Sequence, residues 1–178
     1  FGNKTGVELP AETQGIVRSP EKWNGDSLAS MSIGYEIGVT ALQMATAFAT
    51  IANDGIKVKP HIIKEIRSSG EKPAPTNNSE NARVVSVETA RNLRTMLRQV
   101  VLTGTGKRAQ LNGYTAAGKT GTAWKFNSVT KSIDSSKYIS SFIGMAPADN
   151  PEIVIAVIID EPKGGARDGG GVAAPIFK

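Results

Sequence analysis

The stretch Tyr114-Thr115-Ala116-Ala117-Gly118-Lys119-Thr120-Gly121-Thr122 decides the fold, because its letters fit both a β-strand and a phosphate-binding loop. Two further stretches, 138–146 and 152–160, are rich in apolar and β-branched residues and predict strands. Only residues 147–151 separate them, so we expect these two strands to be antiparallel neighbours. Residues 125–137 are mostly polar and predict a loop after the first strand.

Two helices with apolar faces are expected before these strands. The first follows Thr40, a suitable N-cap, and ends before Gly55. The second follows Ser86 and ends before Gly104. The inward positions of the two helices are Leu42, Ala45, Ala49 and Ala52, and then Val87, Ala90, Leu93, Leu97, Val100 and Val101. The outer face of the second carries Arg91, Arg94 and Arg98 and is interpreted as solvated. The fold class is therefore α/β of the α+β type, with helices packed on an antiparallel sheet.

The remaining segments carry less periodicity. The first thirty residues are rich in glycine and proline and predict an ordered loop. Residues 56–67 alternate β-branched residues with lysines around Pro60, which is typical of edge strands. Residues 68–81 have the composition of a mobile linker, and a last helix is expected to start near Val172.

Composition excludes several classes of protein. With 178 residues the chain is long enough for one domain or a large piece of one. A formal net charge of +5 is too small to indicate nucleic-acid binding. The absence of cysteine and the single His61 argue against a disulfide or a zinc site. The longest apolar run, 153–159, is too short for a membrane-spanning helix, and the ends at Phe1 and Lys178 suggest a fragment.

Residues 113–120 match the Walker A pattern letter for letter, and 153–161 resemble the apolar strand ending in Asp-Glu that often follows it. A phosphate-binding loop needs an apolar parallel strand before it and a helix that starts at the Lys-Thr pair. Residues 107–112 are polar, and the residues after Gly121 are poor helix formers. P-loop nucleotide binding therefore remains an alternative that its context disfavours.

On a strand, Lys119-Thr120-Gly121 resembles the Lys-Thr-Gly motif of the penicillin-recognising serine acyl enzymes. The resemblance covers the whole chain. It is carried by residues 4–10, the Trp23 region, 31–40, 53–55, 104–106, 117–123, 144–147 and 159–162. Together these stretches resemble class B penicillin-binding proteins, and 32–35 ahead of Val39-Thr40 resembles the division type. One departure is Glu36 or Ile37, where that family usually has a small or polar residue.

The resemblance implies a D,D-transpeptidase that cross-links peptidoglycan stem peptides and is acylated by β-lactams. It implies the transpeptidase fold shared with serine β-lactamases, incomplete in this chain, and a reaction without metal or cofactor. Lys119 would stabilise anionic substrate and assist proton movement, and the Thr122 N–H would serve the oxyanion. Thr120 and Thr122 would bind the substrate carboxylate, and Gly121 would keep the strand surface open.

The nucleophile is not expected within this chain. Its Ser-x-x-Lys strings start at Ser19, Ser69 and Ser128, and its Ser-x-Asn string at Ser79. None of them opens a buried helix, which is what places such a lysine beside its serine. We expect residues 1–178 to be the C-terminal portion of one transpeptidase domain, with both motifs in the N-terminal remainder.

The expected partners are stem peptides, β-lactams, that N-terminal remainder and proteins of the division or elongation machinery, without nucleic acid. The expected location is the periplasm or the outer face of the membrane, with an N-terminal anchor that these residues lack. A β-lactamase is disfavoured because the nearest string to Glu-x-x-Leu-Asn, residues 88–92, lies on a predicted helix. A non-catalytic β-lactam sensor or binding module of the same fold remains an alternative.

Overall fold

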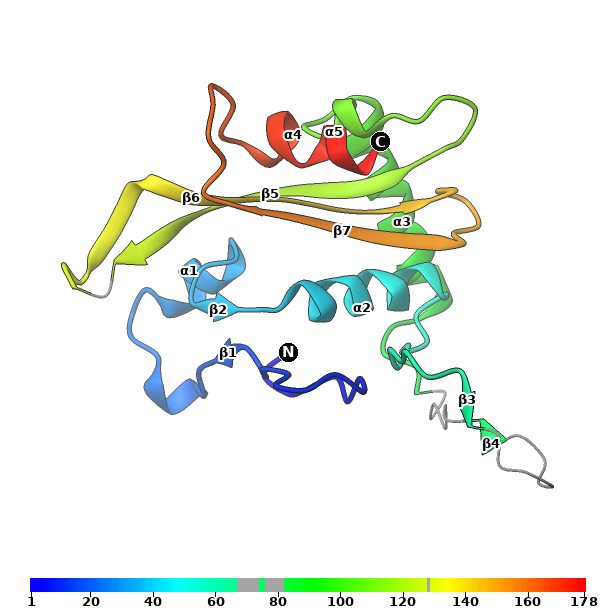
Figure 1. Ribbon diagram of the computed structural model, residues 1–178, viewed down its shortest axis with the longest axis horizontal. Helices are drawn as coiled ribbons and strands as arrows, with labels where there is room; N and C mark the ends of the chain where they lie inside the picture. Colours follow the sequence, from blue (N-terminus) through cyan, green and yellow to red (C-terminus); the bar gives the residue numbers. More distant parts are fainter. Residues whose placement is uncertain (67–73, 76–81, 128) are drawn as a thin grey trace.

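A three-stranded antiparallel sheet lies between helices in the computed structural model, which describes residues 1–66, 74–75, 82–127 and 129–178 (Figure 1). The elements in chain order are β1 (Ile16–Val17), the 3₁₀ helix η1 (Pro20–Lys22), α1 (Ser27–Ser32), β2 (Ile37–Gly38), α2 (Ala41–Ala52), β3 (Glu65–Ile66), β4 (Ala74–Pro75), α3 (Val87–Leu102), the 3₁₀ helix η2 (Lys107–Ala109), β5 (Ala117–Asn127), β6 (Ser132–Ala146), β7 (Ile153–Asp160), α4 (Gly169–Val172) and α5 (Ala174–Phe177). The predicted α+β class is confirmed.

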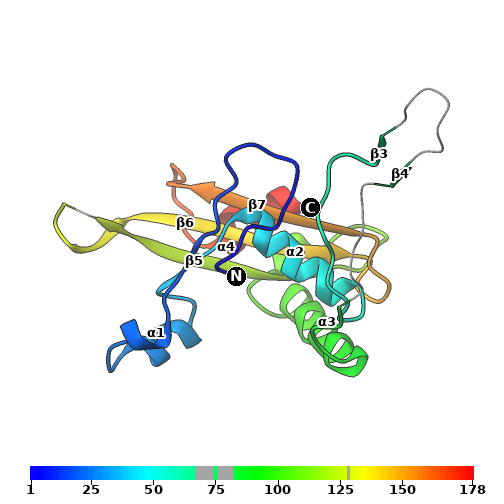
Figure 2. The same cartoon turned by 90° about the horizontal axis from the view of Figure 1, so that it is seen from below.

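The sheet has the order β5-β6-β7, so β5 is an edge strand. β6 pairs antiparallel with both neighbours, as predicted for the last two strands, with Ala117 opposite Met145 and Ala146 opposite Ile153. The loop predicted at 125–137 is wrong, because β5 and β6 continue as a paired hairpin through much of it. This hairpin extends past the helices at one end of the sheet (Figures 1 and 2). The strands are not packed between helices there, so mostly polar residues are compatible with strand pairing.

Helix α2 covers one face of the sheet. Thr40 and Gln43 form a capping box at its start, which confirms the predicted N-cap. Phe48 packs with residues of β5 and β6 in a buried cluster that Met44 and Ile51 extend. The helix therefore faces the sheet with these three residues, which the sequence pattern placed at the flank of its apolar face, and with Ala52, which it placed inward.

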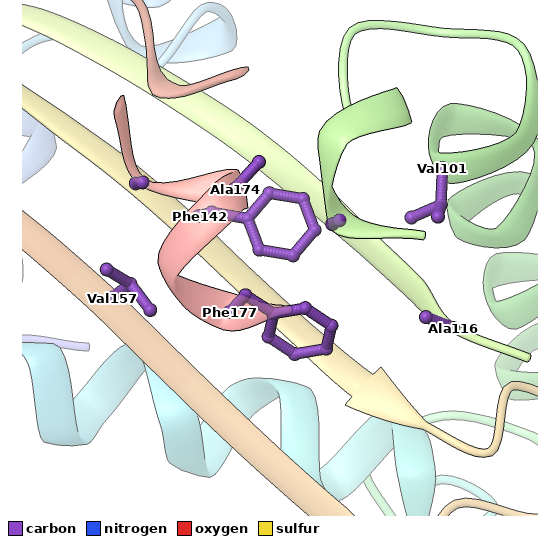
Figure 3. Close-up of a cluster of buried hydrophobic side chains, with 8 residues drawn as sticks. Val101, Ala116, Phe142, Val157, Ala174 and Phe177 are labelled. Atoms are coloured by element: carbon purple, nitrogen blue, oxygen red, sulfur yellow. The ribbon is translucent and has the colours of Figure 1, made fainter. Parts of the chain in front are cut away.

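The opposite face is covered by α4 and α5 and by the end of α3 (Figure 1). Phe142 of β6 and Phe177 of α5 pack with their ring centroids 4.9 Å apart and their planes tilted by 59°, and Val101 of α3 joins the same buried cluster (Figure 3). The last helical segment begins at Gly169, three residues before the predicted start, because Asp168 caps it.

Arg94 corrects the interpretation of α3. This side chain is 9% exposed and donates to Asp54 Oδ1 at 2.8 Å and to the Ile51 carbonyl at 2.8 Å. It therefore ties α3 to the end of α2 and does not belong to a solvated face. The Arg94 hydrogen bond holds the pKa of the Asp54 carboxyl below its usual range.

The first thirty residues form more than a loop, since they contain β1, η1 and most of α1. Glu36, the departure from the family pattern, has φ +60, a left-handed conformation that glycine adopts more easily. Its carboxylate accepts from Ser27 Oγ at 2.9 Å and pairs with Arg18 at 3.3 Å. These contacts offset part of the strain.

The edge strands predicted at 56–67 are mostly absent from the described part of this segment. Ile56 forms an isolated bridge with Arg83, and Glu65–Ile66 (β3) pairs with Ala74–Pro75 (β4). Apart from those two residues of β4, the linker expected at 68–81 lies outside the described residues.

Candidate active site

Lys119 lies on β5, the edge strand, directly opposite Ile143 of β6. Residues directly opposite each other point to the same face of a sheet, and Ile143 belongs to the cluster under α2. The Lys119 side chain is exposed on that face, and its Nζ donates to the Thr120 carbonyl at 2.9 Å. Its cationic group is therefore held at the surface of the strand, as the sequence predicts.

Thr120 points to the other face, opposite Phe142. Its Oγ1 lies 2.7 Å from Thr105 Oγ1, in the turn that follows α3. This hydrogen bond joins the turn to β5, although the two residues are 15 positions apart. Thr105 belongs to a stretch that carried the family resemblance, but no site role was inferred for it from the sequence.

Thr122 shares a face with Thr120, and its hydroxyl is bound by the start of α4. The Gly169 N–H donates to Thr122 Oγ1 at 3.1 Å, and the Asp168 side chain caps the helix by accepting from the Gly171 N–H at 2.8 Å. A Cβ on Gly169 would lie 2.2 Å from the Ser141 carbonyl oxygen and 2.6 Å from that of Gly121. Only glycine allows α4 to approach the sheet this closely.

Gly121 has a packing reason of its own. A Cβ at this position would lie 2.4 Å from Ser141 Oγ on the neighbouring strand. A larger residue here would require the Ser141 hydroxyl to rotate away, so glycine suits the packing whether or not a ligand lies on the strand. The predicted functional reason, an unobstructed surface for an acyl peptide, is compatible with this geometry.

The structure brings the four predicted residues together in one segment, 119–122, at the outer edge of the sheet, where Lys119 and Thr122 are exposed and the two residues between them are half-buried. Lys119 lies on one face and the two threonines lie on the other, and both faces border the same edge. A peptide lying along that edge can contact the ammonium group and the two hydroxyls together. The signal that could have revealed the contact with α4 is Asp168 followed by three glycines, an unusual start for a helix.

The Walker A interpretation fails on geometry. Gly118, Lys119 and Thr120 lie within β5, and no helix starts at the Lys-Thr pair. The motif itself forms the strand, so within the described residues 82–127 no separate strand ends at Gly113 to feed a phosphate-binding loop. The backbone N–H groups needed for a phosphate cradle are therefore not arranged around Lys119.

The Ser19 string lacks the setting of a nucleophile, as expected. Ser19 is exposed, and only the three-residue helix η1 follows it before Trp23 ends the turn. The other strings start at Ser69, Ser79 and Ser128, outside the described residues. Residues 88–92, the nearest match to a β-lactamase motif, lie on α3 as predicted.

Within residues 1–66, 74–75, 82–127 and 129–178, no three His, Asp or Glu side chains converge as a metal site would require. Over the same ranges, no helix combines the length and the apolar character needed to span a membrane.

Comparisons with known proteins show the family of the chain. Residues 1–178 match the penicillin binding protein transpeptidase domain, and the chain belongs to that family. It is 40% identical to penicillin-binding protein PbpB of Mycolicibacterium smegmatis over 99% of this chain and 28% of that protein. It is 39% identical to stage V sporulation protein D of Bacillus subtilis over 99% of this chain and 27% of that protein.

Solved structures lead to the same family. Penicillin binding protein 3 from Mycobacterium tuberculosis, without ligand, superposes with a TM-score of 0.91 at 38% identity, over 99% of this chain and 42% of that one. Its complex with aztreonam superposes at 0.88 and 37% identity, over 99% of this chain and 41% of that one. The predicted family and fold are confirmed, and the chain spans less than half the length of these relatives.

Proposed function

We propose that residues 1–178 form the C-terminal portion of the transpeptidase domain of a peptidoglycan D,D-transpeptidase. The observation that carries this proposal is the position of the Lys119–Thr122 segment on the edge strand of the sheet, with Lys119 and Thr122 exposed, in a chain of the penicillin binding protein transpeptidase family. In such an enzyme a serine attacks a peptide carbonyl of one stem peptide, the amide bond breaks, and the C-terminal residue leaves with a protonated amine. The amine of a second stem peptide then attacks the acyl-enzyme ester, which forms the cross-link and frees the serine. β-Lactams acylate the same serine.

In this proposal each of the residues 119–122 on β5 has its own role in binding or catalysis. Lys119 stabilises negative charge on the substrate and assists proton movement near the nucleophile. An edge strand turns the N–H groups of alternate residues away from its neighbour, and the N–H of Thr122 stabilises the oxyanion of the acyl transfer. Thr120 and Thr122 hold the ligand carboxylate through their hydroxyl groups. Gly121 leaves the surface between them open.

The rest of the enzyme follows from the same proposal. The Ser-x-x-Lys and Ser-x-Asn motifs lie in an N-terminal remainder, which also carries a membrane anchor. The domain works in the periplasm or on the outer face of the membrane, in cell division, with division proteins as partners. Support for the division role, with elongation as the alternative, is the resemblance of 32–35 ahead of Val39-Thr40 to the division type. The aztreonam and ampicillin complexes of the similar structures support β-lactams as ligands.

The experiment is to measure acylation of the full-length protein by a fluorescent penicillin. Lys119→Ala should lower the second-order acylation rate about 100- to 1000-fold, as loss of one electrostatic stabiliser of a transition state typically does. Lys107→Ala, which removes an exposed lysine outside β5, is the matched control and should keep the wild-type rate. If folded Lys119→Ala protein were acylated at the wild-type rate, β5 would not be part of the active site.

Release of cross-linked product from a stem-peptide mimic then separates an enzyme from a sensor. A transpeptidase joins the acyl donor to an added amine, whereas a non-catalytic sensor is acylated by penicillin and forms no such product. Rapid hydrolysis of the acyl-enzyme would instead indicate a β-lactamase.

A further inference from the structure

Three arginines gather on one side of α3, outside the candidate active site. Arg91, Arg94 and Arg98 are spaced three and four residues apart, which places them on one face of the helix. They line a surface hollow of about 460 Å³ between α3 and the turn from β6 to β7, together with Leu102 and Asp149. Figure 2 shows this turn beside α3. The charged residues that line the hollow are therefore three cations and one anion.

These arginines are neutralised to different degrees. Arg94 is the buried one, and the Asp54 carboxylate neutralises its charge within the protein. Arg91 is exposed, and its side chain makes no hydrogen bond or ion pair within residues 1–66, 74–75, 82–127 and 129–178. Arg98 is half-buried and pairs with Asp149. The charge that remains for an external anion therefore comes from Arg91 and, to the extent that Asp149 can be replaced, from Arg98.

The pair between Arg98 and Asp149 is weak. Arg98 Nη1 donates to Asp149 Oδ1 at 3.1 Å and to Oδ2 at 3.4 Å, and the Asp149 side chain is 71% exposed. The Arg98 Nε is buried and has no hydrogen-bond partner among the described residues. A guanidinium binds a carboxylate best through two parallel N–H donors, and an exposed pair contributes little to stability. The pair shows that a carboxylate fits beside Arg98, and a carboxylate that engages two donors would replace Asp149.

Leu102 adds an apolar contact at one end of the hollow. It is 45% exposed and follows Arg98 by four residues, about one turn further along α3. A phosphate polymer has no apolar group to place on this leucine, whereas a peptide can bury an apolar side chain against it. The occupant that fits both features is an acidic peptide segment with an apolar residue close to its carboxylates.

We propose that the hollow between α3 and the β6–β7 turn binds an acidic segment of a partner protein. Arg91 and Arg98 bind two carboxylates of that segment, and Leu102 packs against one of its apolar side chains. A carboxylate of the segment takes the place of Asp149 on Arg98. The binding does not involve residues 119–122, so it stands apart from the function proposed above.

The experiment measures binding of a labelled Glu-Glu-Leu-Glu-Glu-Leu peptide to the full-length protein by fluorescence anisotropy. Its glutamates recur every three residues, about 10 Å in an extended chain, which matches the rise of α3 from Arg91 to Arg98. We expect saturable binding that Arg91→Gln and Arg98→Gln each weaken about three- to tenfold. Leu102→Gln should weaken it about threefold. Lys22→Gln, which removes one exposed charge in η1, is the matched control and should bind like the wild type.

Replacing Asp149 should have the opposite effect. Because Asp149→Asn removes the carboxylate that competes for Arg98, we expect the peptide to bind about two- to fivefold more tightly. Glu152→Gln is the matched control, since it removes an equal charge from the same turn, outside the lining of the hollow. This control variant should bind the peptide like the wild type. An equal gain in both variants would mean that net charge, and not a carboxylate on Arg98, governs the binding.

The remaining outcomes decide the ligand class. The proposal is overturned if the peptide does not bind, or if Arg91→Gln and Arg98→Gln weaken binding no more than Lys22→Gln does. It is also overturned if inorganic polyphosphate binds more tightly than the peptide and Leu102→Gln changes neither affinity. If Arg98→Gln does not fold, Arg98→Lys, which loses the paired donors, carries the same expectation and the same refutation. All variants should be acylated by penicillin at the wild-type rate, so absence of acylation in the wild type would refute the proposed function separately.

Discussion

Replacing Gly169 by alanine tests the contact between α4 and the candidate active-site strand. The new Cβ would lie 2.2 Å from the Ser141 carbonyl oxygen, 2.6 Å from that of Gly121 and 3.0 Å from the Gly121 nitrogen. All three atoms belong to the backbone of the sheet, so no flexible side chain can move aside. Relief requires a displacement of about 1 Å between α4 and the sheet, and such overpacking typically costs about 1 to 3 kcal/mol.

The same displacement reaches the site, because the Gly169 N–H is the donor to Thr122 Oγ1. We therefore expect two effects in the full-length protein. The thermal unfolding midpoint falls by about 2 to 4 °C for each kcal/mol lost. The rate of acylation by penicillin falls about tenfold, as expected when a positioning contact is disturbed.

Gly165→Ala is the matched control. Gly165 lies in the loop before α4, its backbone is not in the left-handed region, and a Cβ there would have no heavy atom within 4 Å. This variant should unfold and react like the wild type. If Gly169→Ala also unfolded and reacted like the wild type, the close approach of α4 to β5 would not be what holds the strand in its reactive position.

Arg94→Met should destabilise the protein by about 1 to 3 kcal/mol in thermal unfolding, because it leaves the Ile51 carbonyl and the Asp54 carboxylate without their donor; an unchanged midpoint would contradict this role. The folded pKa of Asp54 is lowered, so the stability that its carboxylate contributes is present above the unfolded pKa of about 3.9 and is lost as the pH falls through the folded pKa. Below about pH 4 the wild type should therefore lose more stability than Arg94→Met. Phe142→Ala should cost about 3 to 5 kcal/mol in the same measurement, since the ring is fully buried against Phe177, and a loss below 1 kcal/mol would mean that this cluster is not the core.

The helices and the main strands could be predicted from the sequence because local signals agreed with tertiary packing. Thr40 and Ser86 cap α2 and α3 as their residue types indicate. The apolar stretches of β6 and β7 lie over a core on at least one face, so their composition predicts strands. In these segments the hydrophobic pattern predicts the same secondary structure that the fold contains.

The hairpin beyond Trp124 could not be predicted in this way. Its residues pair through the backbone, and polar side chains such as Lys125 and Asp134 are compatible with a solvated ladder. Arg94 was wrongly predicted to lie on a solvated face for a related reason, because an arginine on a helix is expected to be exposed unless its buried partner is known. That partner, Asp54, lies 40 residues earlier in the chain.

The chemistry of the site was only partly accessible from the sequence. The motif at 119–122 and its placement on a strand were predicted, and the structure places these residues on an exposed edge. The contacts of Thr105 with Thr120 and of Gly169 with Thr122 join residues 15 and 47 positions apart. No local pattern encodes such pairs.

The central claim is that β5 lines the site where the acyl-enzyme forms. The most direct test is a crystal structure of the full-length protein after reaction with penicillin. We predict an acyl group lying along β5, with its carbonyl oxygen about 2.7 to 3.1 Å from the Thr122 nitrogen and its carboxylate at the hydroxyls of Thr120 and Thr122. A penicilloyl adduct that makes no contact with residues 119–122 would contradict the claim.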